Sequence, residues 1–188
     1  MSHPSKTGDR KFLHELLKQP EILKIIVNSL AETIVNYAKF SVVAGKPIFR
    51  DGSQKRSIAV AGLIRFDGPQ LSIELMLGFS QDLFLALYEN MFQMPVQEIT
   101  EENQDLAGEI LNIAFGVMDP SLKKQGFELR SSFPIIYVGQ RLNEVLAKIS
   151  AEAIVIPYSH GSKVFEVEIY GIDGLQQDWK YDAARKVA

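Results

Sequence analysis

The chain has 188 residues, of which 46% are hydrophobic and 23% are charged, and its formal net charge at pH 7 is −3. This length suits one sizeable domain, and the acidic balance argues against a nucleic-acid binder that works by neutralising phosphates. The chain has no cysteine, which excludes disulfides, thiolate nucleophiles and thiolate metal sites.

The N-terminal stretch "MSHPSKTGDRKFLHELLKQPE" is polar and lacks the apolar core of a signal peptide. The longest apolar runs, such as "IAVAGLI", are far shorter than the roughly 20 residues of a membrane-spanning helix. We therefore expect a cytoplasmic protein with no membrane insertion.

The first half begins with a helical pattern from Phe12 to Phe40, which Pro20 divides or restarts. A strand-like segment follows in "FSVVAGKPIF". The next stretch, "SIAVAGLIRFDGPQLSIELML", has two apolar runs on either side of "DGP", which predicts a β-hairpin.

A helix is predicted over 80–93, with Ser80 as its N-cap and Pro95 after its end. A long helix should follow the imperfect capping box of Thr100 and Asn103, and Pro120 should interrupt it. Strands are expected in "FELRSSFPIIYVG". A second hairpin is expected in "AEAIVIPYSHGSKVFEVEIYGI", with its turn at "SHGS". For the tail after residue 171, the sequence is consistent with either a short helix or a frayed end.

The two halves share one order of elements: a long helix, a strand and a hairpin. These units span about 21–78 and 101–171, and the helix at 80–93 joins them. The order predicts an α+β fold of pseudo-two-fold duplicated units, with an antiparallel or mixed sheet covered by long helices. Chance recurrence of this order is the alternative. We expect a single domain over 1–188, with a core at about 20–171, an N-terminal arm at 1–19 and a C-terminal tail at 172–188.

Most catalytic signatures are absent from the sequence. His3, His14 and His160 are scattered without metal-ligand spacing, and no P-loop, G-x-G-x-x-G or G-x-S-x-G motif occurs. Trp179, alone in a polar tail, is either a packing anchor or a partner contact.

The stretch "DLAGEILNIAFG" at 105–116 has a polar row on one side of a predicted helix. At about 100° per residue, Asp105, Glu109, Asn112 and Gly116 fall within a stripe about 60° wide. An ordinary solvated face is the simplest interpretation. However, the row has no cation, asparagine suits helix interiors poorly, and glycine costs about 1 kcal/mol there relative to alanine. This combination indicates a surface kept clear for something that docks from outside.

The same stretch resembles the active helix of the CheC/CheX/FliY family of chemotaxis phosphatases. That motif is Asp or Ser, three residues, Glu, two residues, Asn, and usually Gly four positions later; Asp105, Glu109, Asn112 and Gly116 match it. The segments "FSQDLFLALYENMFQMP", "FPIIYVG" and "VIPYSHGSKVFEVEIY" also resemble the family, so the resemblance covers about 20–171. The first-half helix has Glu32 and Asn36 at a spacing one residue too long. With one complete motif, the chain is more similar to CheX than to CheC.

The resemblance implies a CheC-like fold of two pseudo-symmetric halves. It also implies a phosphatase that acts on the phospho-Asp of a CheY-like receiver domain, with Mg²⁺ supplied by that partner and no cofactor of its own. By the same analogy, Asn112 would position the attacking water and Glu109 would bind the receiver's active-site Lys, while Asp105 and Gly116 would serve docking.

Two other functions remain open at this point. One is a non-catalytic receiver-binding scaffold, and the other is a flagellar-switch-like structural protein of the same fold, as in the FliM relatives. CheX-like members form dimers, and exposed hairpin edges could pair between copies, so a homodimer is expected.

Overall fold

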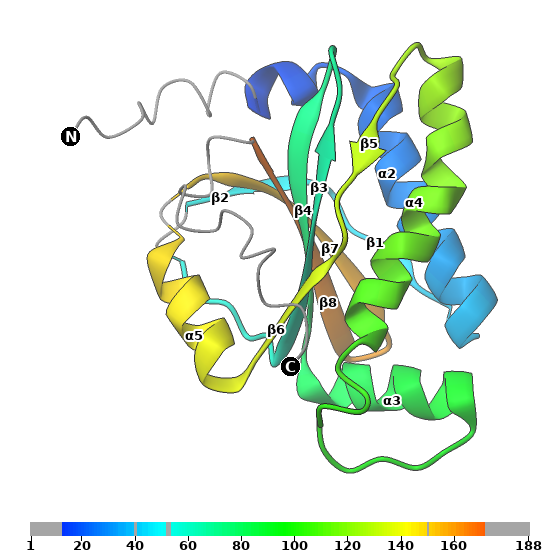
Figure 1. The fold of residues 1–188 in the computed structure, drawn as a ribbon, viewed down its shortest axis with the longest axis vertical. Coiled ribbons are helices and arrows are strands. Elements are labelled where there is room, and N and C mark those ends of the chain that lie inside the picture. The colour runs from blue at the N-terminus through cyan, green and yellow to red at the C-terminus, as the bar shows by residue number, and fades with distance from the viewer. Residues whose placement is uncertain (1–12, 40, 52–53, 150, 172–188) are drawn as a thin grey trace, which may run out of the picture.

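A computed structural model describes residues 13–39, 41–51, 54–149 and 151–171. Within these residues an antiparallel sheet of eight strands has the order β1-β7-β8-β4-β3-β5, with β2 also paired to β7 and β6 to β3 (Figure 1). The strands are β1 Val43–Ala44, β2 Ile48–Arg50, β3 Val60–Asp67, β4 Ser72–Phe79, β5 Arg130–Ser131, β6 Ile135–Val138, β7 Ala153–His160 and β8 Lys163–Gly171.

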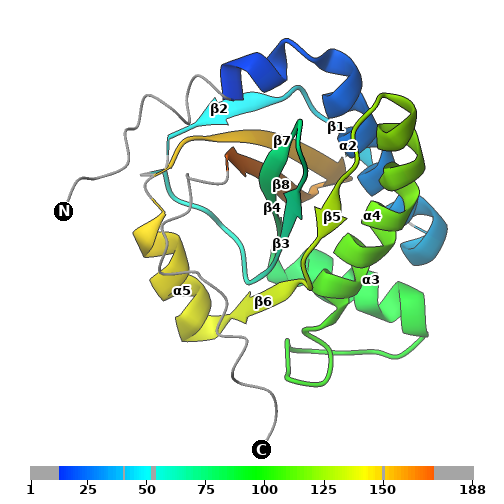
Figure 2. The same ribbon diagram turned by 45° about the horizontal axis from the view of Figure 1, so that its top comes forward.

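Helices cover both faces of this sheet. They are α2 Pro20–Thr33, the π-helical turn η1 Ile34–Ala38, α3 Gln81–Phe92, α4 Leu106–Lys124 and α5 Gly139–Lys148, and a further helical turn spans 13–17. α2 and α4 lie side by side on one face and α5 lies on the other, as the turned view makes clear (Figure 2). The larger hydrophobic core fills the α2/α4 side, and a smaller one lies under α5. No helix in the described ranges is long and apolar enough to cross a membrane.

Both predicted hairpins are present. β3 and β4 pair from Val60↔Phe79 to Asp67↔Ser72, so the "DGP" segment forms their turn. β7 and β8 turn at Gly161, whose φ of 59° is a left-handed conformation that glycine adopts without steric cost. Short turn signals predicted these pairings because a hairpin is specified locally.

The strand order is symmetric about the central pair β4–β8. β3 flanks β4, and β7 flanks β8. Each half of the chain then adds its short strands to the other half's hairpin: β1 and β2 pair with β7, while β5 and β6 pair with β3. Every pair is antiparallel, and the two units interlock. The arrangement has the symmetry that the predicted duplication requires, and the duplication itself stays a prediction.

The expectation that Pro120 interrupts the long helix is wrong, because α4 continues through it to Lys124. Proline lacks an N–H, so the carbonyl of Gly116 loses its usual donor four residues later. Gly116 and Pro120 are both exposed, which leaves that carbonyl open to water. Beyond the proline, Leu122 is buried in the main core, and this burial favours continuing the helix.

Two local features differ from the sequence-based expectations. Helix α5 was not predicted, although its buried Leu142 is followed at helical spacing by Val145 and Leu146, which pack on the smaller core. The hydroxyl of Ser80, at the N-cap of α3, donates to the carbonyl of Val164 at 3.4 Å and caps nothing. Residues 1–12 of the arm, the tail and Trp179 lie outside the described residues.

Candidate functional site

The polar row of α4 faces solvent. Asp105, at the N-cap, and Glu109, Asn112 and Gly116 within the helix are all exposed. The buried residues of α4 are Leu106, Ala107, Gly108, Ile110, Leu111, Ala114, Met118 and Leu122. Helical periodicity therefore separates a packed face from an open one, as the sequence predicted.

A hydrogen-bonded turn sets where α4 begins. The backbone N–H of Thr100 donates to Oδ1 of Asn103 at 2.9 Å, and Nδ2 of Asn103 donates to the carbonyl of Glu98 at 2.9 Å. Asn103 is only 4% exposed, so these bonds satisfy a buried amide. This is one half of the predicted capping box, and it fixes the chain that leads into the polar row.

Close packing fixes the rotation of α4 against the sheet. A Cβ added at Gly108 would lie 2.8 Å from Cδ1 of Ile136 and 3.2 Å from Cβ of Pro134, and a Cβ at Gly62 would lie 3.0 Å from the carbonyl oxygen of Ala107. Both glycines allow an approach that no larger residue would permit without movement. Since the helix cannot turn freely, its exposed row has one orientation.

Gly116 differs from these packing glycines. A Cβ added there would meet nothing within 4 Å. Packing within the described part of the chain therefore does not require glycine at this position. The surface one turn beyond Asn112 is open.

The side chains of Glu109 and Asn112 are uncommitted. Neither has a hydrogen bond or an ion pair with any described residue. Glu109 can accept hydrogen bonds, and the amide of Asn112 can both donate and accept. Their spacing of three residues puts them on neighbouring positions of one helix surface. The pair can therefore bind a cation and orient a small polar molecule at the same time.

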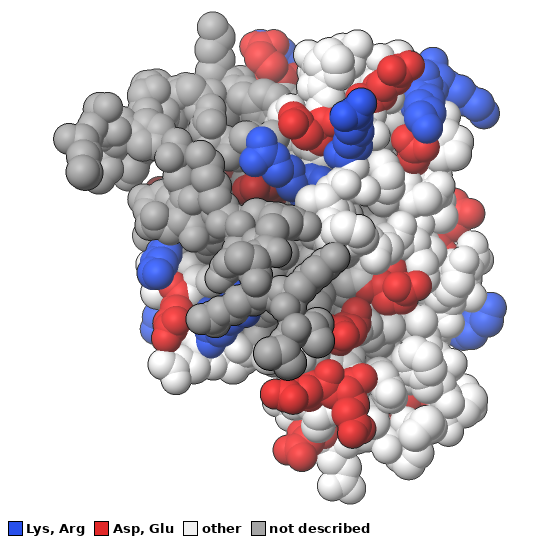
Figure 3. Space-filling model, in the orientation of Figure 1, with Lys and Arg blue, Asp and Glu red and all other residues white. Residues whose placement is uncertain are grey.

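The surroundings of the row are acidic. Residues 81–122 contain eight carboxylates and neither lysine nor arginine. Carboxylates gather over the start of α4 and the loop before it (Figure 3), where Glu98, Glu101, Glu102, Asp105 and Glu109 are all exposed. In the described ranges, no group of three or more His, Asp or Glu side chains could hold a metal ion. The row thus offers hydrogen bonds and negative charge to whatever docks on it.

The first-half helix carries its incomplete version of the motif on a π-helical turn. Glu32 lies on α2 and Asn36 on η1, and both are exposed. The extra residue between them falls where the helix widens, and Val35 and Tyr37 beside it are also exposed. Only α4 presents the complete motif on a regular α-helix within the described residues.

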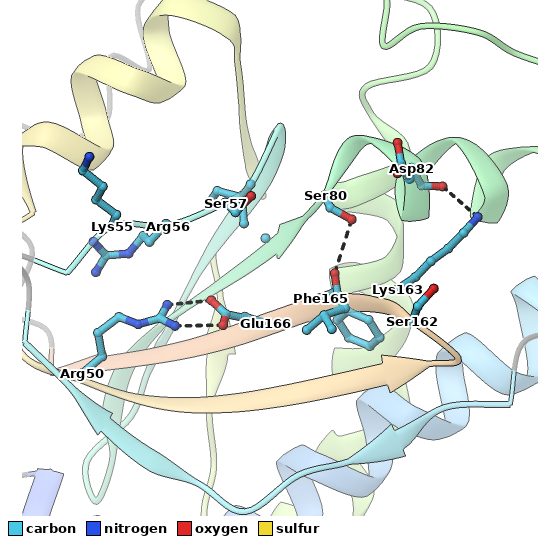
Figure 4. A pocket seen from close by; sticks show the side chains of 13 residues that line it. Arg50, Lys55, Arg56, Ser57, Ser80, Asp82, Ser162, Lys163, Phe165 and Glu166 are labelled. Atoms are coloured by element: carbon cyan, nitrogen blue, oxygen red, sulfur yellow. Dashed lines mark hydrogen bonds and ion pairs between the residues drawn. The ribbon is translucent and has the colours of Figure 1, made fainter.

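A polar cavity of about 500 Å³ lies elsewhere, beside the start of α3 (Figure 4). Its most buried charges pair with each other. Arg50 donates to both carboxylate oxygens of Glu166, at 2.6 and 2.8 Å, and Nε of Arg56 donates to Glu168 at 2.8 Å. Sequence reasoning missed this network, although "FEVEIY" puts both glutamates on one side of β8. Because these guanidinium groups are occupied, we assign the network a structural role, joining β2 and residues 54–59 to β8.

Comparison with protein families gives one match. The family described as "Chemotaxis phosphatase CheX" matches residues 60–159, more than half of the chain and including all of α4. No curated protein matches the chain.

Solved structures resemble about four fifths of the chain. A CheC-like superfamily protein from Shewanella sp. PV-4 is 26% identical with a TM-score of 0.68, over 80% of this chain and 96% of that one. Chemotaxis protein CheX from Vibrio vulnificus is 23% identical with a TM-score of 0.69, over 80% and 98%. A chain of the CheX–CheY–BeF3–Mg²⁺ complex from Borrelia burgdorferi is 16% identical with a TM-score of 0.64, over 79% and 96%. These likenesses confirm the predicted CheC-like α+β fold.

Proposed function

The chain belongs to the CheX family of chemotaxis phosphatases, and from that premise we propose that it hydrolyses the aspartyl phosphate of a CheY-like receiver domain. The observation that carries this proposal is the exposed, uncommitted pair of Glu109 and Asn112 on α4. A related CheX has been solved with CheY, BeF3 and Mg²⁺, which supports a receiver as the partner.

Asn112 is the proposed catalytic residue. Hydrolysis of a phosphoryl group needs a water held in line with the bond that breaks, and positioning and electrostatics supply most of the catalysis. The amide oxygen of Asn112 would accept a hydrogen bond from that water, while its NH₂ group can donate to a phosphoryl oxygen. An amide stays neutral at any working pH, so it brings no negative charge to an anionic phosphoryl group.

Glu109 is the proposed partner for the receiver's active-site lysine. A carboxylate one turn from the amide would draw this cation to the helix and so align the receiver with Asn112. Asp105 and Gly116 flank the pair: Asp105 would add charge at the docking surface, and Gly116 would leave the receiver room to approach.

The metal ion in this reaction belongs to the receiver. Mg²⁺ bound there neutralises charge on the phosphoryl oxygens. The phosphatase then contributes the water-positioning amide and the docking carboxylate. Its own residues need not form a covalent intermediate.

The test is phosphate release from a panel of phosphorylated receiver domains, measured with and without the chain. We expect at least one receiver to lose phosphate faster when the chain is added. If receivers bind tightly but none is dephosphorylated faster, the chain is a receiver-binding scaffold and the phosphatase function is wrong.

We also propose that the chain forms a homodimer. The strands β1 and β2 at one end of the sheet, and β5 and β6 at the other, have no further strand on their outer side within the described residues, and backbone groups on such an edge can pair with another copy. Light scattering on the protein as it elutes from a size-exclusion column should give about twice the chain mass of 21.1 kDa. A mass of one chain at micromolar concentration would contradict the dimer.

A further inference from the structure

An exposed aromatic ring lies on the loop that packs against α4. Phe133, in the loop between β5 and β6, is 79% exposed, the highest value among the exposed large hydrophobic side chains of the described residues. Single apolar side chains on a surface are common and usually need no explanation. This one is unusual because its loop is fixed against the helix that carries the proposed site.

Hydrogen bonds to β3 hold the loop in place. The backbone N–H of Ser132 donates to the carbonyl of Arg65 at 2.9 Å, and the backbone N–H of Arg65 donates to Oγ of Ser132 at 3.1 Å. On the other side of Phe133, Pro134 packs against α4 at Gly108. The ring therefore projects from backbone that is fixed on both sides. A partner that binds it loses little free energy to ordering this loop.

Helix geometry puts this loop at the border of the polar row. Asn112 lies about 40° round α4 from Gly108, and Glu109 lies about 100° round in the same direction. Leu111, which packs on Gly62 of the sheet, lies about 60° in the opposite direction. The face of α4 at Gly108, which contacts the Pro134 loop, thus lies between the face that packs on the sheet and the face that carries the polar row.

We propose that Phe133 is a specificity-determining docking residue for the receiver, and this inference rests on the proposed phosphatase function. Its ring contacts an apolar part of the receiver surface next to the phosphorylated pocket while Glu109 and Asn112 engage the pocket itself. The eight carboxylates of residues 81–122, unaccompanied by any lysine or arginine, select a receiver whose rim around that apolar part is basic. Hydrophobic contact at a fixed aromatic ring, surrounded by charge, is a common way to anchor an interface.

The experiment compares Phe133→Ala with Phe49→Ala in steady-state phosphate release from the cognate phosphorylated receiver. Phe49 is also partly exposed, but it lies on β2, which pairs with β7 toward the opposite end of the sheet. We expect Phe133→Ala to raise KM about tenfold with kcat changed less than twofold. Phe133→Leu should restore most of the affinity, and Phe49→Ala should keep the wild-type KM.

A binding measurement separates failure of this inference from failure of the proposed function. The dissociation constant of a receiver loaded with beryllium fluoride and Mg²⁺ is measured for the wild type and for Phe133→Ala. A weakened complex without any hydrolysis by the wild type would overturn the phosphatase function and keep the docking role. Normal hydrolysis with unchanged KM and dissociation constant in Phe133→Ala would overturn the docking role alone.

A second copy of the chain is the other possible occupant, because Phe133 is near the outer strands β5 and β6. Light scattering on both proteins distinguishes it. The same mass for the wild type and Phe133→Ala is expected. A dimer that becomes a monomer on substitution would assign the ring to self-association and overturn the proposal.

Discussion

The carboxyl group of Glu74 is buried in surroundings that disfavour its charged form. It lies on β4, is 8% exposed, and its Oε2 atom has no hydrogen-bond partner in the described part of the chain. Burial raises the pKa of this carboxyl to about 7, and the nearby charge of Arg65, its neighbour across the β3–β4 pair, only partly opposes that rise. A buried carboxylate without full compensation destabilises the fold whenever it is ionised.

The pH dependence of stability follows from this pKa. The folded state holds the proton of Glu74 up to about pH 7, whereas the unfolded chain releases it near the ordinary value of 4.5. The folded state thus binds more protons in this window, and the free energy of unfolding falls as pH rises through it, by up to about 3 kcal/mol. Urea unfolding at pH 5 and pH 8 measures the fall.

Glu74→Gln is the matched control for this measurement. Glutamine keeps the shape and cannot ionise, so most of the fall in stability between pH 5 and pH 8 should vanish. A Glu74→Gln protein whose stability falls as steeply as the wild type would show that other groups cause the pH dependence.

Gly116 allows stability and function to be separated at one position. Alanine there meets no other atom within 4 Å, and it favours the helix by about 1 kcal/mol relative to glycine. We expect Gly116→Ala to raise the free energy of unfolding by up to that amount in urea titrations. If the glycine provides clearance for the receiver, the same variant should show a higher KM for the phosphorylated receiver. Unchanged stability and unchanged KM together would contradict both roles.

At the scale of elements, the network of β2, β8 and residues 54–59 is a structural anchor. The side chain of Arg56 is 2% exposed, and it donates through Nε to both oxygens of Glu168, at 2.8 and 3.1 Å. Glu168 also accepts from the hydroxyl of Tyr170 at 2.5 Å and from Arg50 at 3.1 Å. Removing one partner of such a buried group leaves an uncompensated charge.

Arg56→Ala should therefore lower the free energy of unfolding by about 3–5 kcal/mol, because the Glu168 carboxylate would stay buried, away from water, without its main cationic partner. Chemical denaturation measures the loss. The exposed Arg130→Ala serves as the control and should change stability by less than about 0.5 kcal/mol. A small effect at Arg56 would mean that the network contributes little to the fold.

The elements differ in how well they could be predicted from their sequences. Both hairpins were predictable because "DGP" and "SHGS" specify them within a few residues. The exposed row of α4 was predictable because helical periodicity assigned its two faces. The path of α4 through Pro120 was not, since it depends on the burial of Leu122 by distant residues. The Arg50–Glu166 pair, 116 residues apart, depends on strand pairings that short motifs do not encode.

At the scale of the whole molecule, charge is unevenly distributed. The net charge is −3, yet residues 81–122 alone carry eight carboxylates with no lysine or arginine. This segment includes α3, the loop before α4 and the polar row itself. A concentrated field of one sign steers a partner of the opposite sign toward the site.

Salt should weaken this steering. We expect KM for the phosphorylated receiver to rise between about 50 and 300 mM salt, because the Debye length shortens toward the spacing of surface charges. Replacing Glu101 and Glu102 together by glutamine should flatten the dependence without altering kcat. A KM that is constant or falls with salt would contradict a basic rim on the partner.

The central claim is that the amide of Asn112 positions the attacking water. The most direct test is the rate of phosphate release from a saturating phosphorylated receiver by Asn112→Ala, with Asn143→Ala as control. Asn143 is an exposed asparagine on α5, which covers the opposite face of the sheet. We expect kcat to fall by about 100-fold or more in Asn112→Ala with receiver binding retained, and to stay at the wild-type value in Asn143→Ala. A wild-type kcat in Asn112→Ala would contradict the claim.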